Sequence, residues 1–303
     1  MSISGFMIIK NGISGGYPFI EAILSVLSIC NEFLVSDGFS VDGTWEALKK
    51  LSEKYSKIKL YHDIWHGKKK KGEILAEMTN ILKGRCKGDY CLYVQGNEIY
   101  HEEIINKISE LPEIYPRVEM FSFPFRNIIG EKYVFHYDDF RVRLIKNLPE
   151  IIARGDAWTL GYNIKELAIR NPYKLFIYLK NKELIRRHIY LNYPVYRYYA
   201  LFPENYINKL KMHLKIYTDR KIASDIKLMY KLCLKLKNKR YKCPEKFWDS
   251  FVHSIWPKLS LLNPFLPKKL SYLTIDDHPK IMKPLFGRWK YFNGGSPVQS
   301  TID

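Results

Sequence analysis

Two short segments of the chain carry polar side chains where a predicted buried strand ends. Residues 37–42 (DGFSVD) place two acids around a glycine-bearing turn, and residues 95–98 (QGNE) follow an apolar strand directly. A carboxylate in the second segment can hold Mg²⁺ or Mn²⁺ against a diphosphate, because these hard cations prefer oxygen ligands. For the first segment, an ordinary strand-to-helix loop in which Asp42 or Thr44 caps the helix is the alternative.

The elements that must position these segments follow from the apolar pattern. Helical spacing alternates with short apolar runs at intervals of roughly 25 to 30 residues, which is typical of right-handed βαβ units in a parallel sheet. Ligands of such a doubly wound sheet gather beyond the carboxyl ends of its strands, where both polar segments lie. The predicted strands are 5–10, 32–36, 57–61 and 90–95, and the predicted helices are 17–29, 45–55 and 72–82.

Three stretches in register carry a resemblance to a known family. They are DGFSVDGTW (37–45), GEILAEMTN (72–80) and GDYCLYVQGNEIYHEE (88–103). They resemble the motifs DGGSTDGTW, G-x-x-x-A-x-x-x-N and GD(W/Y)-x-x-x-x-QADE-x-x-HEE of one branch of the family 2 glycosyltransferases. The resemblance covers residues 4–110 well and residues 130–160 and 271–290 loosely. It implies an α/β fold of the GT-A type, Rossmann-like with a mixed sheet, and the transfer of a sugar from a nucleotide-sugar donor to a hydroxyl acceptor with inversion.

The resemblance also implies which residues bind the donor. Asp37 would contact the base or ribose of the nucleotide, and Asp42 would shape the same loop. Gly72, Ala76 and Asn80 recur every four residues and share one helix face, whose small side chains let the helix approach the nucleotide. Packing of that face against the sheet is the alternative. The implied donor-binding residues are Asn11, Asp37, Asp42, Gly72, Asn80 and Gln95.

The expected metal position departs from the family pattern. The Asp that should bind the cation is replaced by Asn97, which Glu98 follows. An amide oxygen can ligate a cation but brings no charge, so affinity should be weaker unless Glu98 compensates. A segment like the branch's F-x-G-HP-x-x-M makes His278 a further metal candidate, with an isolated surface histidine as the alternative. A divalent cation, Mn²⁺ or Mg²⁺, is the implied cofactor, and weak metal dependence, metal independence and a nucleotide-binding relic all stay open.

An inverting transfer needs a base that takes the proton of the acceptor hydroxyl, and family 2 enzymes use Asp or Glu. The candidates are Asp138 and Asp139 in HYDDFRVRLIKN and Asp156 in ARGDAWTLGY. We favour Asp156, because a turn after a strand reaches into a cleft more easily. Pairing with Arg141 or Arg143 is the alternative role of Asp138 and Asp139.

The net charge of +18 comes entirely from the second part of the chain. Residues 1–160 carry 21 basic and 21 acidic residues, whereas residues 161–303 carry 28 and 10. We therefore predict a catalytic domain over 1–160 and a basic, mainly helical region over 161–303, in which 271–290 folds back on the active site. The stretches 174–190 and 225–242 predict amphipathic helices with basic outer faces. A helical cap with solvated lysines and contact with an anionic membrane surface both explain them.

Composition also bears on compartment and partners. The five cysteines form no CxxC pair, no window reaches about 18 uninterrupted apolar residues, and the first residues lack a basic segment leading into an apolar one. We expect a reduced cytoplasmic protein without signal peptide or membrane span, with peripheral membrane contact as the alternative. The expected partners are a nucleotide-sugar donor and a glycan, lipid or protein acceptor.

Two other functional classes are weighed against the transferase. A nucleic-acid-binding protein would use phosphate contacts from the basic region, but it leaves Asp37 and Glu98 without a role, so nucleic acid is not the favoured partner. A catalytically lapsed nucleotide-sugar-binding protein is the other alternative, and Asn97 motivates it.

Overall fold

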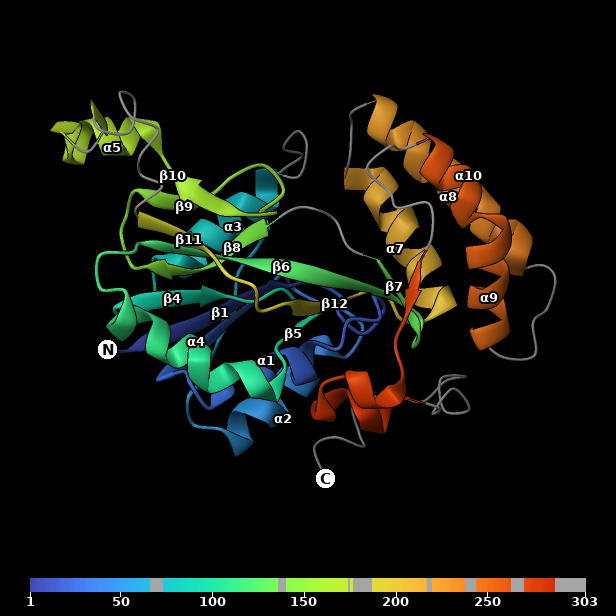
Figure 1. The fold of residues 1–303 in the computed structure, drawn as a ribbon, viewed down its shortest axis with the longest axis horizontal. Coiled ribbons are helices and arrows are strands. Elements are labelled where there is room, and N and C mark those ends of the chain that lie inside the picture. The colour runs from blue at the N-terminus through green and yellow to red at the C-terminus, as the bar shows by residue number, and fades with distance from the viewer. Residues whose placement is uncertain are drawn as a thin grey trace.

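A curled mixed sheet with helices on both faces forms the centre of the fold (Figure 1). The structure is a computed structural model, and it describes residues 1–65, 73–135, 140–173, 175–176, 187–216, 220–237, 244–262 and 270–286. The strands are β1 (Ile3–Ile9), β2 (Glu32–Asp37), β3 (Ile58–His62), β4 (Tyr90–Tyr93), β5 (Glu98–Ile99), β6 (Met120–Ile129), β7 (Tyr133–Phe135), β8 (Phe140–Lys146), β9 (Ile151–Ala153), β10 (Leu160–Tyr162), β11 (His188–Tyr190), β12 (Val195–Ala200) and β13 (Ser271–Tyr272). The helices are α1 (Phe19–Leu27), α2 (Thr44–Lys54), α3 (Glu73–Lys83), α4 (Glu102–Ile114), α5 (Ile164–Arg170), α7 (Pro203–Ile216), α8 (Arg220–Lys237), α9 (Pro244–Ser254) and α10 (Trp256–Leu262), with the 3-10 turns η3 (Ile275–Asp277) and η4 (Lys280–Leu285).

The first four strands are parallel, as the alternating pattern predicts. β1 lies between β2 and β4, so that Ile9 pairs with Asp37 and Phe6 pairs with Tyr93. The described order across the sheet is β13-β7-β6-β8-β4-β1-β2-β3, in which β8 runs antiparallel to β4. The mixed α/β class is confirmed, and each predicted element of residues 5–95 ends within two residues of its observed bounds.

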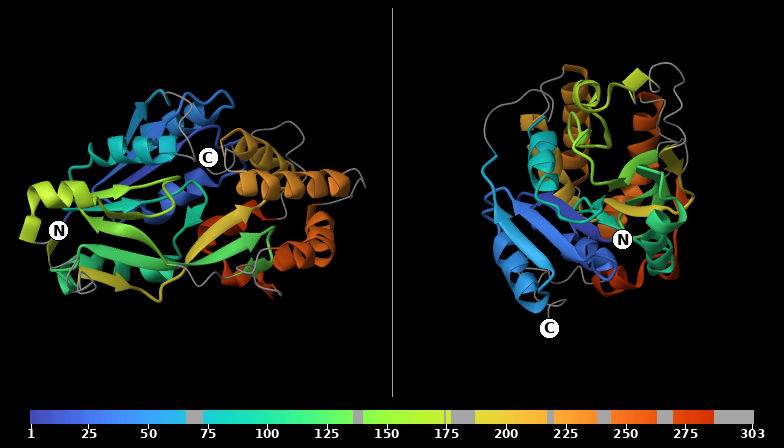
Figure 2. Two further views of the ribbon diagram at one scale, coloured as in Figure 1. Left: turned by 90° about the horizontal axis from the view of Figure 1, so that it is seen from above. Right: turned by 90° about the vertical axis from the view of Figure 1, so that its left-hand side faces the viewer.

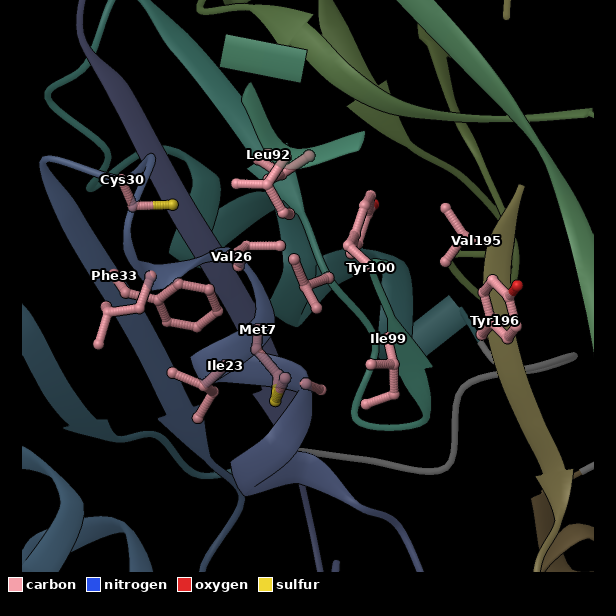
Figure 3. Close-up of a cluster of buried hydrophobic side chains, with 14 of the residues drawn as sticks. Met7, Ile23, Val26, Cys30, Phe33, Leu92, Ile99, Tyr100, Val195 and Tyr196 are labelled. Atoms are coloured by element: carbon pink, nitrogen blue, oxygen red, sulfur yellow. The ribbon is translucent and has the colours of Figure 1, made fainter. Parts of the chain in front are cut away.

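One hydrophobic core joins the two regions that the charge pattern separates. Met7, Ile23 and Phe33 pack where α1 covers β1 and β2, and the same cluster continues to Val195 of β12 (Figure 3). β12 pairs with β6 and β5, and β11 pairs with β6. The central sheet therefore extends across the predicted boundary at residue 160.

The opposite face of the sheet carries α3 and the β9–β10 hairpin (Figure 2). Helices α7 to α10 pack together around Cys233, Trp248 and Phe251 beside the end of β6 and β7 (Figure 1). α8 confirms the helix predicted within 225–242 up to Lys237. The helix predicted over 174–190 is wrong at its end, because residues 188–190 form β11 by pairing with β6. No helix among the described residues combines the length and apolar character that crossing a bilayer requires.

Candidate active site

The loops after β1 and β2 are tied together at the carboxyl edge of the sheet. Asp37 ends β2 and is fully buried, and its carboxylate accepts hydrogen bonds from the N–H of Ser40 (2.8 Å) and from the Ser40 hydroxyl. The Ser40 Oγ accepts from the N–H of Asn11 (2.7 Å), whose side-chain oxygen accepts from the N–H of Val41 (3.0 Å). Asn11 adopts a left-handed backbone, with φ of 51°, which asparagine tolerates better than most residues. Asn11 and Asp37, both predicted donor contacts, thus fix the shape of the two loops.

Asp42 links the same two loops one turn further on. Its Oδ2 accepts from the N–H of Ser14 (2.7 Å), and its Oδ1 accepts from the hydroxyl of Thr44 (2.5 Å). The Thr44 Oγ1 in turn accepts from the N–H of Ile13 (3.2 Å). This network places the start of α2 against the loop after β1.

An aromatic stack borders Asp37 on the β3 side. The His62 ring lies between Phe39 and Trp45, with ring centroids 3.8 Å and 4.2 Å away. The His62 Nε2 is 3.1 Å from Asp37 Oδ2. Phe39 has a φ of 56° and is 45% exposed, so a strained backbone holds a large ring at the surface there.

Asp63 anchors the end of β3 next to Asp37. Arg85 donates two hydrogen bonds to its carboxylate, at 2.5 Å and 2.8 Å, and the Ser36 hydroxyl donates a third at 2.7 Å. The Arg85 guanidinium also lies over the Tyr61 ring, 4.4 Å from its centroid. The hydrogen bonds from Arg85, followed by the one from Ser36, lower the pKa of Asp63 against the opposing effect of burial.

Removal of this pair should change how stability depends on pH. A carboxyl whose folded pKa is lowered contributes stability above its unfolded pKa of about 3.9, and that contribution disappears as pH falls through the folded value. Arg85→Met should therefore cost about 1 kcal/mol more at pH 7 than at pH 2. Urea unfolding followed by circular dichroism at both pH values measures the difference, and Asp63→Asn should show the same pH profile. An Arg85→Met deficit that is equal at both pH values would contradict the role of the pair.

The second polar segment meets the turn that carries Asp156. The side-chain nitrogen of Gln95 donates to the carbonyl oxygen of Ala157 (3.2 Å). Gly155 and Ala157 have φ values of 58° and 57°, which makes the turn between β9 and β10 tight, and the N–H of Trp158 donates to Asp156 Oδ1 (3.3 Å). The structure therefore brings Asp156, the favoured base, beside the predicted donor contact Gln95.

Asn80 supports that turn through the backbone of β9. Its amide nitrogen donates to the carbonyl oxygen of Ala153 (3.0 Å), and its amide oxygen accepts from the N–H of the same residue (2.8 Å). Through these two bonds Asn80 holds α3 against β9, the strand that leads to Asp156. Three other predicted site residues, Gly72, Asp138 and Asp139, lie outside the described residues.

Glu98 forms a fully buried ion pair with Arg143. The guanidinium donates to both carboxylate oxygens at 2.7 Å, and neither side chain is exposed. Rings of Tyr93 and Phe125 flank Arg143, each 5.2 Å from its guanidinium carbon. Burial opposes the charge of Arg143, but Glu98 more than offsets this and raises the pKa of the guanidinium. Arg143, which could have paired with Asp138 or Asp139, is thus bonded to Glu98.

Asn97 and His278 also have partners within the protein. The Asn97 amide nitrogen donates to the carbonyl oxygen of Tyr198 (3.3 Å). His278 is buried, with Nδ1 2.9 Å from the Tyr198 hydroxyl and Nε2 2.8 Å from the carbonyl oxygen of Glu131. An Nε2–H that donates to the carbonyl leaves Nδ1 to accept from the hydroxyl, so both ring nitrogens are occupied. These bonds attach the segment 270–286 to β12 and to the turn before β7.

The predicted metal residues do not fit a divalent cation in this arrangement. Both oxygens of Glu98 are bonded to Arg143, and both ring nitrogens of His278 are bonded. The remaining candidate, Asn97, offers an uncharged amide oxygen, whereas Mg²⁺ and Mn²⁺ sites are built around carboxylates. Within the described parts of the chain, no three His, Cys, Asp or Glu side chains gather as a metal site would require.

Two basic residues beside Gln95 and Tyr17 were not predicted as site residues from the sequence. Arg197 of β12 stacks on Trp158, with its guanidinium carbon 3.9 Å from the ring centroid, and it contacts the Gln95 side-chain oxygen at 3.4 Å. Lys209 of α7 donates to the carbonyl oxygen of Tyr199 (3.2 Å) and lies 5.3 Å from the centroid of the Tyr17 ring. The sequence around Arg197, VYRYYA, alternates as a strand does, and this is the only local indication of its role. Its position in the site depends on the pairing of β12 with β6, which joins residues far apart in sequence.

Comparison with known proteins finds no matching family model and no matching curated protein. The 1–349 fragment of S. aureus TarS in complex with UDP is 12% identical, with a TM-score of 0.40 and coverage of 84% of this chain and 75% of that chain. Mannosyltransferase PcManGT from Pyrobaculum calidifontis, in complex with GDP-Man and Mn²⁺, is 12% identical, with a TM-score of 0.41 and coverage of 87% and 81%. Glucosyl-3-phosphoglycerate synthase from Mycobacterium tuberculosis, in complex with Mn²⁺ and UDP-glucose, is 11% identical, with a TM-score of 0.39 and coverage of 72% and 80%.

Proposed function

We propose that this protein is a glycosyltransferase that moves a sugar from a nucleotide-sugar donor to a hydroxyl acceptor with inversion. The observation that supports it best is the convergence of Asn11, Asp37, Gln95 and Asp156 at the carboxyl edge of β1, β2 and β4. Ligands of parallel α/β sheets bind at this edge. The three motifs in register with the family 2 pattern supply the independent support from sequence.

Each group has a role in the proposed reaction. The loops held by Asp37 and Asn11 would receive the nucleoside, and Gln95 would face the sugar diphosphate. The carboxylate of Asp156 would take the proton of the acceptor hydroxyl. The oxygen of that hydroxyl would attack the anomeric carbon as the bond to the departing nucleoside diphosphate breaks. No step is assigned to a metal ion, because Glu98 is bonded to Arg143.

A panel of UDP-, GDP- and TDP-sugars tests the donor half of this reaction. We expect one nucleotide class to bind, as measured by calorimetry, and its sugar nucleotide to be hydrolysed slowly when water replaces the acceptor. The panel should be run with Mn²⁺ and with EDTA, since the site residues predict that turnover survives the chelator. Absence of both binding and hydrolysis across the whole panel, with and without Mn²⁺, would refute the proposal.

A nucleotide-sugar-binding protein without turnover is the second candidate. The burial of Glu98 in an ion pair favours it. The acid expected to bind the metal is replaced by Asn97, and the neighbouring carboxylate of Glu98 is bonded to Arg143. Tight donor binding without any hydrolysis or transfer would support this candidate. Gain of Mn²⁺-dependent turnover in Asn97→Asp would show that a lost metal ligand is the cause.

A further inference from the structure

Two buried basic side chains, Arg197 and Lys209, lie beside the loops after β1 and β4. Arg197 is 7% exposed and Lys209 is 8% exposed. Arg197 contacts Gln95, which belongs to the loop after β4, and Lys209 lies over Tyr17, which belongs to the loop after β1. Both cations therefore face loops that the proposed function assigns to the donor.

Neither cation has an acidic partner in the described parts of the chain. The Nε of Arg197 is buried without a hydrogen-bond partner. The carboxylate that most favours its charged form is Glu98, whose oxygens are already bonded to Arg143. Lys209 has a backbone carbonyl as its hydrogen-bond partner. Burying a charge without a counter-charge is costly, so proteins seldom retain such a pair without a use for it.

Burial disfavours the charged form of both groups, and Arg197 adds to this effect at Lys209. Burial, with a smaller contribution from the nearby Arg197, lowers the pKa of the Lys209 amine to about 7. Burial also lowers the pKa of Arg197, against the attraction of Glu98. An anion between them would relieve both costs at once, because it offers each donor a charged acceptor.

We propose that Arg197 and Lys209 form a diphosphate-binding site that neutralises the donor's phosphates in place of a divalent cation. The guanidinium presents a planar set of donors suited to two phosphate oxygens, and the ammonium supplies a point charge. Stacking on Trp158 fixes the plane of the guanidinium before a ligand arrives. The inference rests on the proposed function for the identity of the ligand as a nucleoside diphosphate, but the anion site itself is argued from the two cations.

Calorimetry of the full chain with UDP, GDP, TDP and inorganic pyrophosphate, all in EDTA, tests the site. We expect pyrophosphate and one nucleotide to bind without metal, and Arg197→Met and Lys209→Met each to weaken both by about tenfold or more. Arg197→Lys should fall between the wild type and Arg197→Met, because it keeps the charge and loses the planar donors. The matched controls are Lys211→Met, at an exposed position of α7, and Arg117→Met, at an exposed position before β6.

Stability separates a binding role from a structural one. Lys209→Met removes a buried amine that has no counter-charge among the described residues and keeps a side chain of similar length, so its thermal midpoint without ligand should equal or exceed that of the wild type. Binding within twofold of wild type in both folded methionine variants would overturn the site while leaving the proposed function standing. Pyrophosphate binding that depends on Arg197, without binding of any nucleotide, would uphold the anion site and overturn its assignment to a nucleoside diphosphate. Failure of all four probes to bind the wild type would overturn the site.

Discussion

Replacing Glu98 with glutamine is expected to lower the free energy of unfolding by about 3 to 5 kcal/mol, because the charge of Arg143 is left buried without a partner. The two side chains are fully buried and share two hydrogen bonds of 2.7 Å. An arginine cannot lose its proton in a protein, so the uncompensated charge cannot be neutralised by titration. Urea unfolding at pH 7, followed by circular dichroism, measures the loss.

The reverse substitution and the double variant sharpen this prediction. Arg143→Met should cost less than Glu98→Gln, because a buried carboxyl can take up a proton where a guanidinium cannot release one. Glu98→Gln combined with Arg143→Met should recover more than half of the loss, since both charges are then gone. Glu103→Gln is the matched control, because its side chain is 80% exposed in the same segment. A loss below about 1 kcal/mol in Glu98→Gln, together with loss of Mn²⁺ binding, would return Glu98 to the metal role that the motif implies.

The part of the fold that could be predicted is the part whose contacts are local in sequence. β1, β2, β3 and β4 alternate with helices at short intervals, and α1 and α2 each contact the strand that follows them, β2 and β3. Periodicity reports such units directly, because the same residues that set the period also make the contacts. The segments after β2 and β4 therefore fell at the carboxyl edge as predicted.

The partner of Glu98 could not be predicted for the opposite reason. Glu98 follows a strand and reads as a metal ligand, yet its carboxylate is satisfied by Arg143, 45 residues later on β8. That contact depends on β8 pairing antiparallel with β4, which no periodicity in either strand encodes. The same limit hid Arg197, whose strand β12 pairs with β6 and β5.

The basic residues of the second region are not all exposed at the surface. The excess of basic residues does lie in residues 161–303, and most lysines of a basic helix are solvated. Arg197 and Lys209 are exceptions, because β12 enters the central sheet and α7 packs beside the loop after β1, where Asn205 donates to the carbonyl oxygen of Ser14 (2.9 Å). Both residues lie outside the two stretches, 174–190 and 225–242, for which basic outer faces were predicted, and both are buried beside the loops of the candidate site.

Replacing Asp156 with asparagine is expected to reduce turnover by about 10² to 10⁴-fold, because an amide cannot take the proton of the attacking hydroxyl. The turn should keep its shape, since the asparagine oxygen can still accept from the N–H of Trp158, and Gln95 still holds Ala157. The dissociation constant of the donor should therefore change by less than about twofold, which separates loss of the base from loss of the site. Donor hydrolysis and calorimetry on the same preparation measure the two quantities.

Asp276→Asn provides the matched control for this substitution, because its side chain is 88% exposed on η3. Asp138→Asn and Asp139→Asn are the rival substitutions, and each should leave turnover within about threefold of wild type if Asp156 is the base. A collapse of turnover in either rival, with Asp156→Asn close to wild type, would move the base to that residue. Equal losses of donor affinity and turnover in Asp156→Asn would instead show that the turn binds the donor, because a base acts in the transition state and not in the ground state.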